Sequence, residues 1–381
     1  MKYSAKYEEN LKRLRDCTQH KHIDRIPHFS NFFTWKMLDS DLHPKLSEAL
    51  SDYGMLDRIQ CEFHERYHFD TYYDLNCRNL LKPSAVLGSG THHVINDEME
   101  SINFIDHVLM EGDEYEEYRD NRTSVNWKMW TRKCPDLTRE GMARSMVLQM
   151  ENTAFTAYMK QKFAEEYDIP YAYGPVNIQV PFERFNKYYR GIKEAHLDLR
   201  RKKALLKDVF DKIQQDEVMP NLKNNLKNDT SHFMNDAMAA MLSHTMLSEK
   251  QWEEMFWPYM KMQLDEVLSV GKTVLLYLEN SILRFKDYFL DYPKGFITIV
   301  PEMDDVIDIR KEMPNLGIAG GMNVSMLQDG TEQDCIDRVK YLADELGDGF
   351  MLGQNKMVSF RRDCKRENLL AVCDYLQNFR W

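Results

Sequence analysis

The sequence predicts an α/β fold, because strand-like apolar runs alternate with helical segments through its C-terminal half. Strands are expected from Thr273, in GFITIV, in LGIAG from Leu316 and in GDGFMLG, and helices over residues 248–270, 302–313, 331–346 and 366–379, with a short helix near Phe285. Strands and helices that alternate at this spacing are typical of parallel βαβ units. A chain of 381 residues lies within the size range of single α/β barrels.

Several helix boundaries in this half carry their own sequence signals. Ser248 and Gln251 form a capping box, in which the serine hydroxyl accepts from the third helical amide and the glutamine side chain reaches back. Thr331 starts a second helix, and Gly347 ends it, because glycine turns left-handed at little cost. Pro258 lies within the first of these helices and predicts a kink there.

The N-terminal half is less regular. IPHFSNFF from Ile26, HFDTYYDL from His68 and DIPYAYG from Asp168 are strand-like, and residues 137–167 and 183–216 are helical in pattern. No internal repeat, low-complexity tract or Gly/Ser linker divides the chain. One continuous domain is therefore the simplest interpretation, and eight βα units would close it into a (β/α)8 barrel.

The first residues, MKYSAKYEENLKRLRD, predict an amphipathic helix without an apolar signal core. We assign residues 1–25 to an N-terminal helical extension, which is expected to pack on the outside of the barrel, and residues 26–381 to the barrel domain.

Composition excludes several classes of function. A formal net charge of −11 without a long Lys/Arg run argues against nucleic-acid binding, which needs a basic face. No apolar stretch approaches the length that spans a bilayer, so no membrane association is expected. Seven widely spaced cysteines are an odd number in a chain large enough to need no disulfides, which favours a reducing, cytoplasmic location.

The segment KTVLLYLENS ends an apolar strand in polar side chains. Successive residues of a strand point to opposite faces, so Tyr277 and Glu279 share one face, while Leu276 and Leu278 take the other. In barrels of this kind the chemistry lies at the C-terminal ends of the strands. Because glutamate is seldom buried without a reason, Glu279 is the sharpest candidate for a functional residue; an ion pair with Arg284 is the structural alternative.

Taken together, four C-terminal segments resemble the uroporphyrinogen decarboxylase superfamily, which includes corrinoid-dependent methyltransferases. They are SEKQWEEMFWPYMK, VLLYLENS, AGGMNVSMLQDGTEQD and the terminal GFMLG with RENLLAV, and RIPHFS and PFERFNKYYRGIKE are also similar. The resemblance implies a (β/α)8 TIM barrel over most of the chain.

The resemblance also narrows the expected activity. The true decarboxylase binds its many substrate carboxylates with arginines just after the first strand, whereas this chain has no arginine from Ile26 to Leu56. The methyltransferase branch is left. It implies an enzyme that moves a methyl group from a small methoxylated aromatic donor to the cobalt of a corrinoid carried by a separate corrinoid-binding protein.

Within that branch, the matching strand ends in His-x-Cys, and a second Cys follows the last strand; together they hold zinc. The corresponding positions here are Tyr277, Glu279 and Lys356. Tyrosine and lysine are poor zinc ligands, so only Glu279 could still bind the metal, with a histidine such as His232. We therefore expect Glu279, Tyr277 and Lys356 to form a hydrogen-bonded catalytic set that activates the leaving oxygen. A different zinc site, with Glu279 and a histidine such as His232 as ligands, is the alternative.

Further polar residues are expected to bind the substrate. They follow strand-like segments or lie in the loop before the Ser248 helix, and each could equally cap a loop: His28, Asn31, His232, Asn235, Asp236, Glu302 and Asn323.

Two other functions stay open. HERYH, from His64 to His68, matches the His-Glu-x-x-His pattern of zinc hydrolases, in which two histidines share a helix face and the glutamate activates water. However, His68 runs directly into a strand-like segment and no third ligand follows at a familiar spacing. The other alternative is a barrel of this superfamily that binds a small ligand without catalysis.

Overall fold

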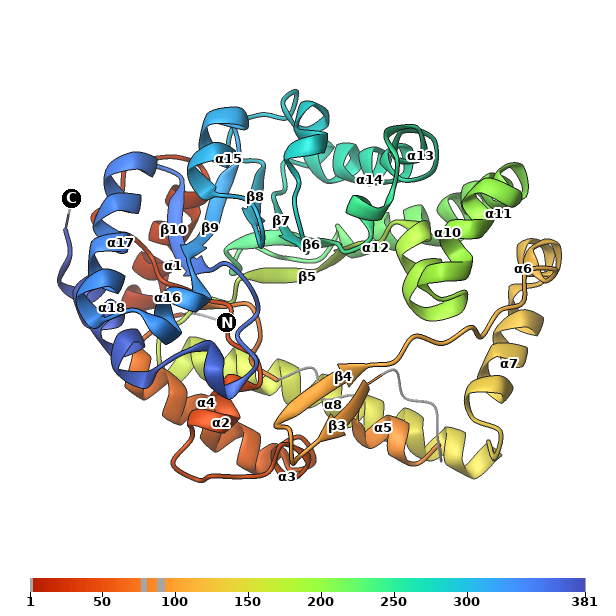
Figure 1. Cartoon of the computed structure of the whole chain (residues 1–381), viewed down its shortest axis with the longest axis horizontal. Coiled ribbons are helices and arrows are strands. Elements are labelled where there is room, and N and C mark those ends of the chain that lie inside the picture. Colours follow the sequence, from red (N-terminus) through yellow and green to blue (C-terminus); the bar gives the residue numbers. More distant parts are fainter. Residues whose placement is uncertain (1–2, 77–80, 88–92, 381) are drawn as a thin grey trace.

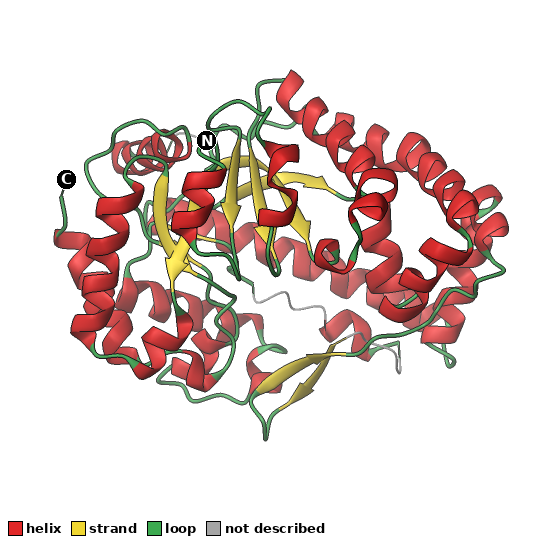
Figure 2. Cartoon of the chain, turned by 45° about the horizontal axis from the view of Figure 1, so that its top comes forward, coloured by secondary structure: helices red, strands yellow, loops and turns green. Residues whose placement is uncertain are grey.

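The chain has a mixed α/β fold built on a six-stranded parallel sheet (Figure 1). The computed structural model describes residues 3–76, 81–87 and 93–380. Sheet order follows chain order, and the strands are β5 (Tyr173–Ile178), β6 (Asn235–Met241), β7 (Val274–Leu278), β8 (Ile297–Val300), β9 (Gly317–Met322) and β10 (Phe350–Gln354). Helices surround these strands (Figure 2).

Two short strands extend this sheet at both ends. β1 (Phe29–Ser30) and β2 (Thr71–Tyr72) pair in parallel. At one end His28 forms a parallel bridge to Leu352 of β10, and at the other the Ala172 amide donates to the Tyr72 carbonyl oxygen at 3.3 Å. The arrangement of strands is therefore barrel-like.

The predicted alternation in the C-terminal half is confirmed. Its helices are α13 (Glu249–Met255), α14 (Trp257–Ser269), α15 (Val306–Glu312), α16 (Val324–Asp329), α17 (Glu332–Leu346) and α18 (Arg366–Asn378). The capping box predicted at Ser248 forms, a second one joins Thr331 and Asp334, and Gly347 ends α17 with a φ of +55°. The backbone breaks at Phe256, just before Pro258, because proline cannot continue the hydrogen bonding of the preceding turn.

The N-terminal half departs further from expectation. Its helices are α1 (Ala5–Thr18), α2 (Trp35–Asp39), α3 (Leu46–Ala49), α4 (Tyr53–Tyr67), α5 (Leu81–Ala85), α6 (Tyr115–Asp120), α7 (Arg122–Lys133), α8 (Arg139–Glu166), α9 (Pro181–Arg184), α10 (Ile192–Arg201), α11 (Lys203–Ile213) and α12 (Met219–Asn225). The helical pattern predicted over 183–216 is divided at Gly191, which has a φ of +75°, and at Lys202, which has a φ of −133°, and π-helical turns lie at Phe185–Tyr189 and Gln214–Val218. An antiparallel hairpin of β3 (His93–Asn96) and β4 (Ser101–Phe104) was not predicted.

Helix α1 closes the N-terminal end of the strand arrangement. Leu14 and Cys17 belong to the same apolar cluster as the inward-facing residues Phe29, Leu275, Val300 and Met351. The Tyr7 hydroxyl donates to the His232 carbonyl oxygen at 2.7 Å, and the Arg15 guanidinium donates to the Phe233 carbonyl oxygen at 2.9 Å. The helix expected on the outer side therefore packs beneath the strands, and its apolar face fills their interior from below.

A glycine makes one of these contacts possible. Gly295 precedes β8 with a φ of +81°, and a Cβ at this position would lie 2.8 Å from the Gln19 Cα. Only glycine combines that backbone conformation with so close an approach.

Among the described residues, no helix is long and apolar enough to cross a membrane. The described cysteines are free thiols, and most are buried.

Replacing Leu14 by alanine tests the role of α1. We expect Leu14→Ala to lower the free energy of unfolding by about 2–5 kcal/mol, because it leaves a cavity in a fully buried apolar cluster. Lys12→Ala, on the exposed side of the same helix, should change it by less than about 0.5 kcal/mol. Urea denaturation followed by circular dichroism measures both, and equal losses in the two variants would show that α1 does not stabilise the interior.

Candidate functional site

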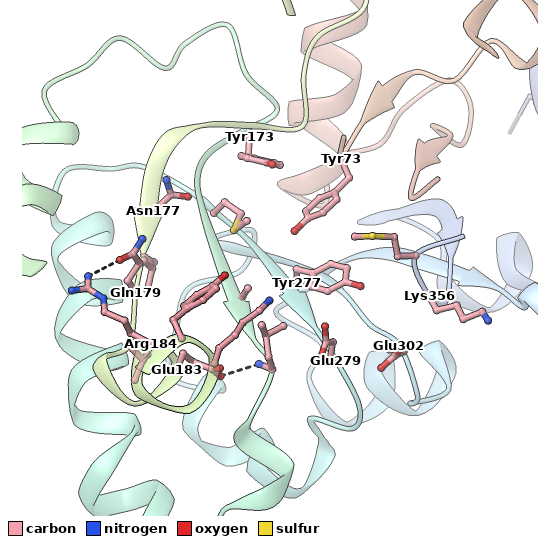
Figure 3. Close-up of a pocket in the computed structure, with 18 of the residues that line it drawn as sticks. Tyr73, Tyr173, Asn177, Gln179, Glu183, Arg184, Tyr277, Glu279, Glu302 and Lys356 are labelled. Carbon is pink, nitrogen blue, oxygen red and sulfur yellow. Dashed lines mark hydrogen bonds between the residues drawn. The ribbon is translucent and has the colours of Figure 1, made fainter. Parts of the chain in front are cut away.

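A cavity of about 800 Å³ lies at the C-terminal ends of the strands (Figure 3). Its lining is aromatic and charged: Tyr73, Tyr173, Asn177, Ile178, Gln179, Val180, Glu183, Arg184, Lys187, Tyr188, Tyr189, Met238, Ala240, Leu242, Tyr277, Glu279, Glu302, Lys356, Met357 and Phe360. This volume suits a small organic ligand.

Tyr277 and Glu279 both line the cavity, as the alternation along β7 predicts. The Tyr277 ring stacks on the Tyr73 ring with centroids 5.1 Å apart and an interplanar angle of 24°. Leu276 and Leu278 point the other way and are fully buried in the layer between strands and helices. One strand therefore supplies a ring and a carboxyl group to the same cavity.

Glu183 also contributes an acidic group to this cavity, and the sequence analysis missed it. It lies on α9, whose first residue is Pro181. Its Oε1 accepts hydrogen bonds from the amides of Leu242 at 2.9 Å and Ser243 at 3.0 Å, just beyond β6 (Figure 3). Burial raises the pKa of the Glu183 carboxyl, the two amides lower it, and the nearby Glu279 raises it further.

Lys356 also lines the cavity, but its ammonium group is held by a different carboxylate. Its Nζ donates to Asp363 Oδ1 at 2.9 Å, and Asp363 Oδ2 accepts from the amides of Ser359 and Phe360. Figure 3 shows the Lys356 side chain directed away from Glu279. The expected pairing of Lys356 with Glu279 is therefore replaced by an ion pair that stabilises the loop after β10.

Glu302 is the remaining predicted residue in the cavity wall. Its Oε2 accepts a hydrogen bond from the Asn280 amide at 2.7 Å, and Asn280 adopts a φ of +64°. One of its oxygens therefore holds the left-handed turn that directly follows Glu279.

Three other predicted substrate-binding residues are not among those that line the cavity. His28 is buried, with its ring 4.0 Å from that of Phe69 and its Nδ1 3.7 Å from the Cys373 sulfur on α18. The Asn31 backbone amide donates a hydrogen bond to Gln354 Oε1 at 2.9 Å. Asn323 precedes α16 and its Oδ1 accepts from Asn355.

His232, Asn235 and Asp236, which were expected to bind the substrate, are not among the residues that line this cavity. β6 begins at Asn235, so these residues lie at the N-terminal end of the strand, beside α1. Asp236 accepts hydrogen bonds from Thr230 and Thr273 and lies 3.6 Å from the Arg15 guanidinium. The residues that β6 contributes to the cavity are Met238 and Ala240.

The HERYH segment does not form the helical metal site that its pattern indicates. α4 ends at Tyr67, and His68 caps it with a φ of +50°. His64 is buried among aromatic rings, its Nδ1 lies 2.8 Å from the Tyr72 hydroxyl, and burial lowers its pKa to about 4. Nowhere in residues 3–76, 81–87 and 93–380 do three His, Cys, Asp or Glu side chains converge as metal ligands. Glu279 and His232 therefore belong to no such cluster, and Tyr277 and Lys356 are poor zinc ligands. The described residues do not fit the zinc site that the family resemblance implies.

A second cavity of about 580 Å³ adjoins the first. It reaches the β3–β4 hairpin through His93, Ile102 and Phe104. The two cavities share a set of lining residues, namely Glu183, Lys187, Tyr188, Leu242, Glu279 and Met357. The carboxyl groups of Glu183 and Glu279 therefore lie where the two cavities meet.

The polar side chains of β5 were also missed. Asn177 in β5 and Gln179 just after it line the cavity with exposed side chains, whereas Val176, Ile178 and Val180 are buried, although Ile178 and Val180 also form part of the cavity wall. This alternation is visible in the sequence. It was overlooked because the strand was expected from Asp168, five residues before β5 begins.

Comparison with known proteins supports the fold. The structure resembles that of a methyltransferase from Methanosarcina mazei, with a TM-score of 0.63 and 12% sequence identity, over 97% of this chain and 98% of that one. At this identity the likeness shows a shared fold. No protein-family model matches the chain, and no curated protein matches it.

Zinc analysis tests the ligand assignment. We expect no stoichiometric zinc at Tyr277, Glu279 and Lys356 after incubation with zinc chloride and desalting, because the phenol and the ammonium must each lose a proton before binding. Elemental mass spectrometry measures the zinc content. Near-stoichiometric zinc that is lost in Glu279→Ala would contradict this expectation, and zinc lost in His64→Ala would restore the hydrolase hypothesis.

Proposed function

We propose that this protein is a methyltransferase on a closed (β/α)8 barrel. Its donor is a small methoxylated aromatic compound, and its methyl acceptor is the cobalt of a corrinoid carried by a separate corrinoid-binding protein. The observation that carries the proposal is the cavity at the strand ends, where Tyr277 and Glu279 emerge from one strand between aromatic walls. The fold shared with a methyltransferase supports it.

The lining of the cavity favours an aromatic donor. Tyr73, Tyr173 and Tyr277 form one side of it, with ring centroids of neighbouring pairs 5.1 to 5.5 Å apart. Met238 and Met357 add flexible apolar surface, which adapts to a flat ligand. A methoxylated benzene ring fits a cavity of this size and character.

Removal of a methyl group from an ether requires help for the leaving oxygen. In the proposed reaction, reduced cobalt attacks the methyl carbon, and the electron pair of the carbon–oxygen bond stays on oxygen. Hydrogen bonding and proton donation by side chains assist this step. Glu279 and Tyr277 are the proposed groups, since both line the cavity. The proposed role of Lys356 is indirect: its ion pair with Asp363 fixes the loop that forms part of the cavity wall.

The two meeting cavities also suit a reaction between two substrates. A donor in one and an acceptor that approaches through the other would meet at Glu183 and Glu279, which line both. A barrel that only binds a small ligand would need no such second space. Turnover distinguishes the two functions.

Single-turnover methylation tests this proposal. With 2-methoxyphenol as donor and chemically reduced cobalamin as acceptor, we expect Glu279→Gln to lower the rate by about 10²- to 10⁴-fold, because the shape is kept while charge and proton are removed. Tyr277→Phe should lower it as well. The visible spectrum of the cobalt reports the rate.

The matched control is Glu253→Gln, an exposed carboxyl group on α13 that accepts from the Tyr288 hydroxyl and should leave the rate unchanged. Unchanged rates in both cavity variants would show that these residues are structural. No transfer by the unmodified protein from any methoxylated aromatic would favour the non-catalytic alternative.

A further inference from the structure

The two carboxyl oxygens of Glu183 have different surroundings. Oε1 accepts two backbone hydrogen bonds, from Leu242 and Ser243. Oε2 is shielded from solvent and has no hydrogen-bond partner among the described residues. A shielded carboxylate oxygen without a partner carries the full cost of its lost hydration. The carboxyl group is thus anchored at one oxygen and unsatisfied at the other.

No positive charge in the described chain forms an ion pair with Glu183, although three cationic side chains share its cavity. Arg184 donates to Glu217 at 2.6 Å and to Gln179 at 2.9 Å. The Lys356 ammonium is bound by Asp363. Lys187 lies over two rings, with its Nζ 5.6 Å from the centroid of Phe104 and 5.5 Å from that of Tyr188.

A second carboxyl group adds to the effect of burial on the pKa of Glu183. Glu279 lines the same two cavities, and its charge, together with burial, raises the pKa of Glu183. Two carboxylates cannot both ionise cheaply in a shielded site. A proton on Oε2 removes the uncompensated charge and its repulsion with Glu279, while Oε1 keeps both amide hydrogen bonds. The cavity thus offers an O–H donor rather than a second negative charge.

We propose that Glu183 holds a proton on Oε2 at neutral pH, and that the bound donor displaces the side chains that shield Oε2 and receives this proton on its leaving oxygen. The donor role rests on the proposed methyl transfer, whereas the bound proton rests on the shielded, unpartnered Oε2 and on the nearby Glu279, and it does not depend on the reaction. This assigns to Glu183 a function that the sequence analysis did not foresee.

The step is balanced without a further reactant. Reduced cobalt supplies the electron pair for the new cobalt–carbon bond and is formally oxidised by two electrons. The methyl–oxygen bond breaks and its electron pair stays on oxygen. The Glu183 proton moves to that oxygen, so the products are a phenol, a methylated corrinoid and the Glu183 carboxylate, which takes a proton back from water before the next turnover.

Infrared spectroscopy measures the bound proton directly, without a substrate or a partner. The carbonyl stretch of a protonated carboxyl group is separate from the bands of a carboxylate. At neutral pH we expect this stretch in the unmodified protein and in the Glu253→Gln control, and its loss in Glu183→Gln. Glutamine keeps the two amide hydrogen bonds through its oxygen, so the variant should fold, and an unchanged thermal unfolding midpoint verifies this.

If Glu183→Gln removes no protonated carboxyl band, the inference is wrong, whether or not the protein transfers methyl groups. If the band is lost as expected, kinetics tests the donor role. Glu183→Gln should bind 2-methoxyphenol with similar affinity and lower the single-turnover rate by about 10²- to 10⁴-fold. The rate of the unmodified protein should fall as pH rises through the pKa of Glu183, because the donor form is lost.

If the unmodified protein transfers methyl groups and Glu183→Gln does so at the same rate, the donor role is wrong. If the unmodified protein shows the protonated carboxyl band but transfers no methyl group, the proposed function and the donor role are both wrong, and only the bound proton stands.

Discussion

The alternation of side chains along β7 is the constraint on which the site depends. Leu275 and Tyr277 face the interior, and Glu279 is the next residue on that face. Below Tyr277 the interior is apolar and is filled from beneath by Leu14 and Cys17 of α1. Above it the lining becomes polar. The apolar layer therefore closes the lower half of the interior, and the cavity with its carboxyl groups can form only at the C-terminal ends of the strands.

A second constraint places Glu183 beside the end of β5. β5 ends at Ile178, and Pro181 starts α9 almost at once, so Glu183 follows the strand end closely. The amides of Leu242 and Ser243, just after the neighbouring strand, fix its Oε1. Two adjacent strand ends thus orient one carboxyl group toward Glu279, at the boundary of two cavities.

The sequence predicted the elements whose signals are local. The capping box at Ser248, the helix start at Thr331, the break at Pro258 and the shared face of Tyr277 and Glu279 depend only on near neighbours. Glu183 could not be found in this way, because its bonds join it to residues about 60 positions away. His232, Asn235 and Asp236 were expected at the substrate because the start of β6 at Asn235 was not recognised, whereas the strand-like segments predicted from Ile26 and His68 do contain β1 and β2. Lys356 was correctly placed at the cavity, but its partner Asp363 was not recognised.

The most direct test of the account is a crystal structure of the protein with 2-methoxyphenol. The account predicts the ring beside Tyr73 and Tyr277 in the cavity at the strand ends, with its ether oxygen within about 3.2 Å of Glu183 Oε2. A ring bound elsewhere, or one whose oxygens face away from Glu183 and Glu279, would contradict it.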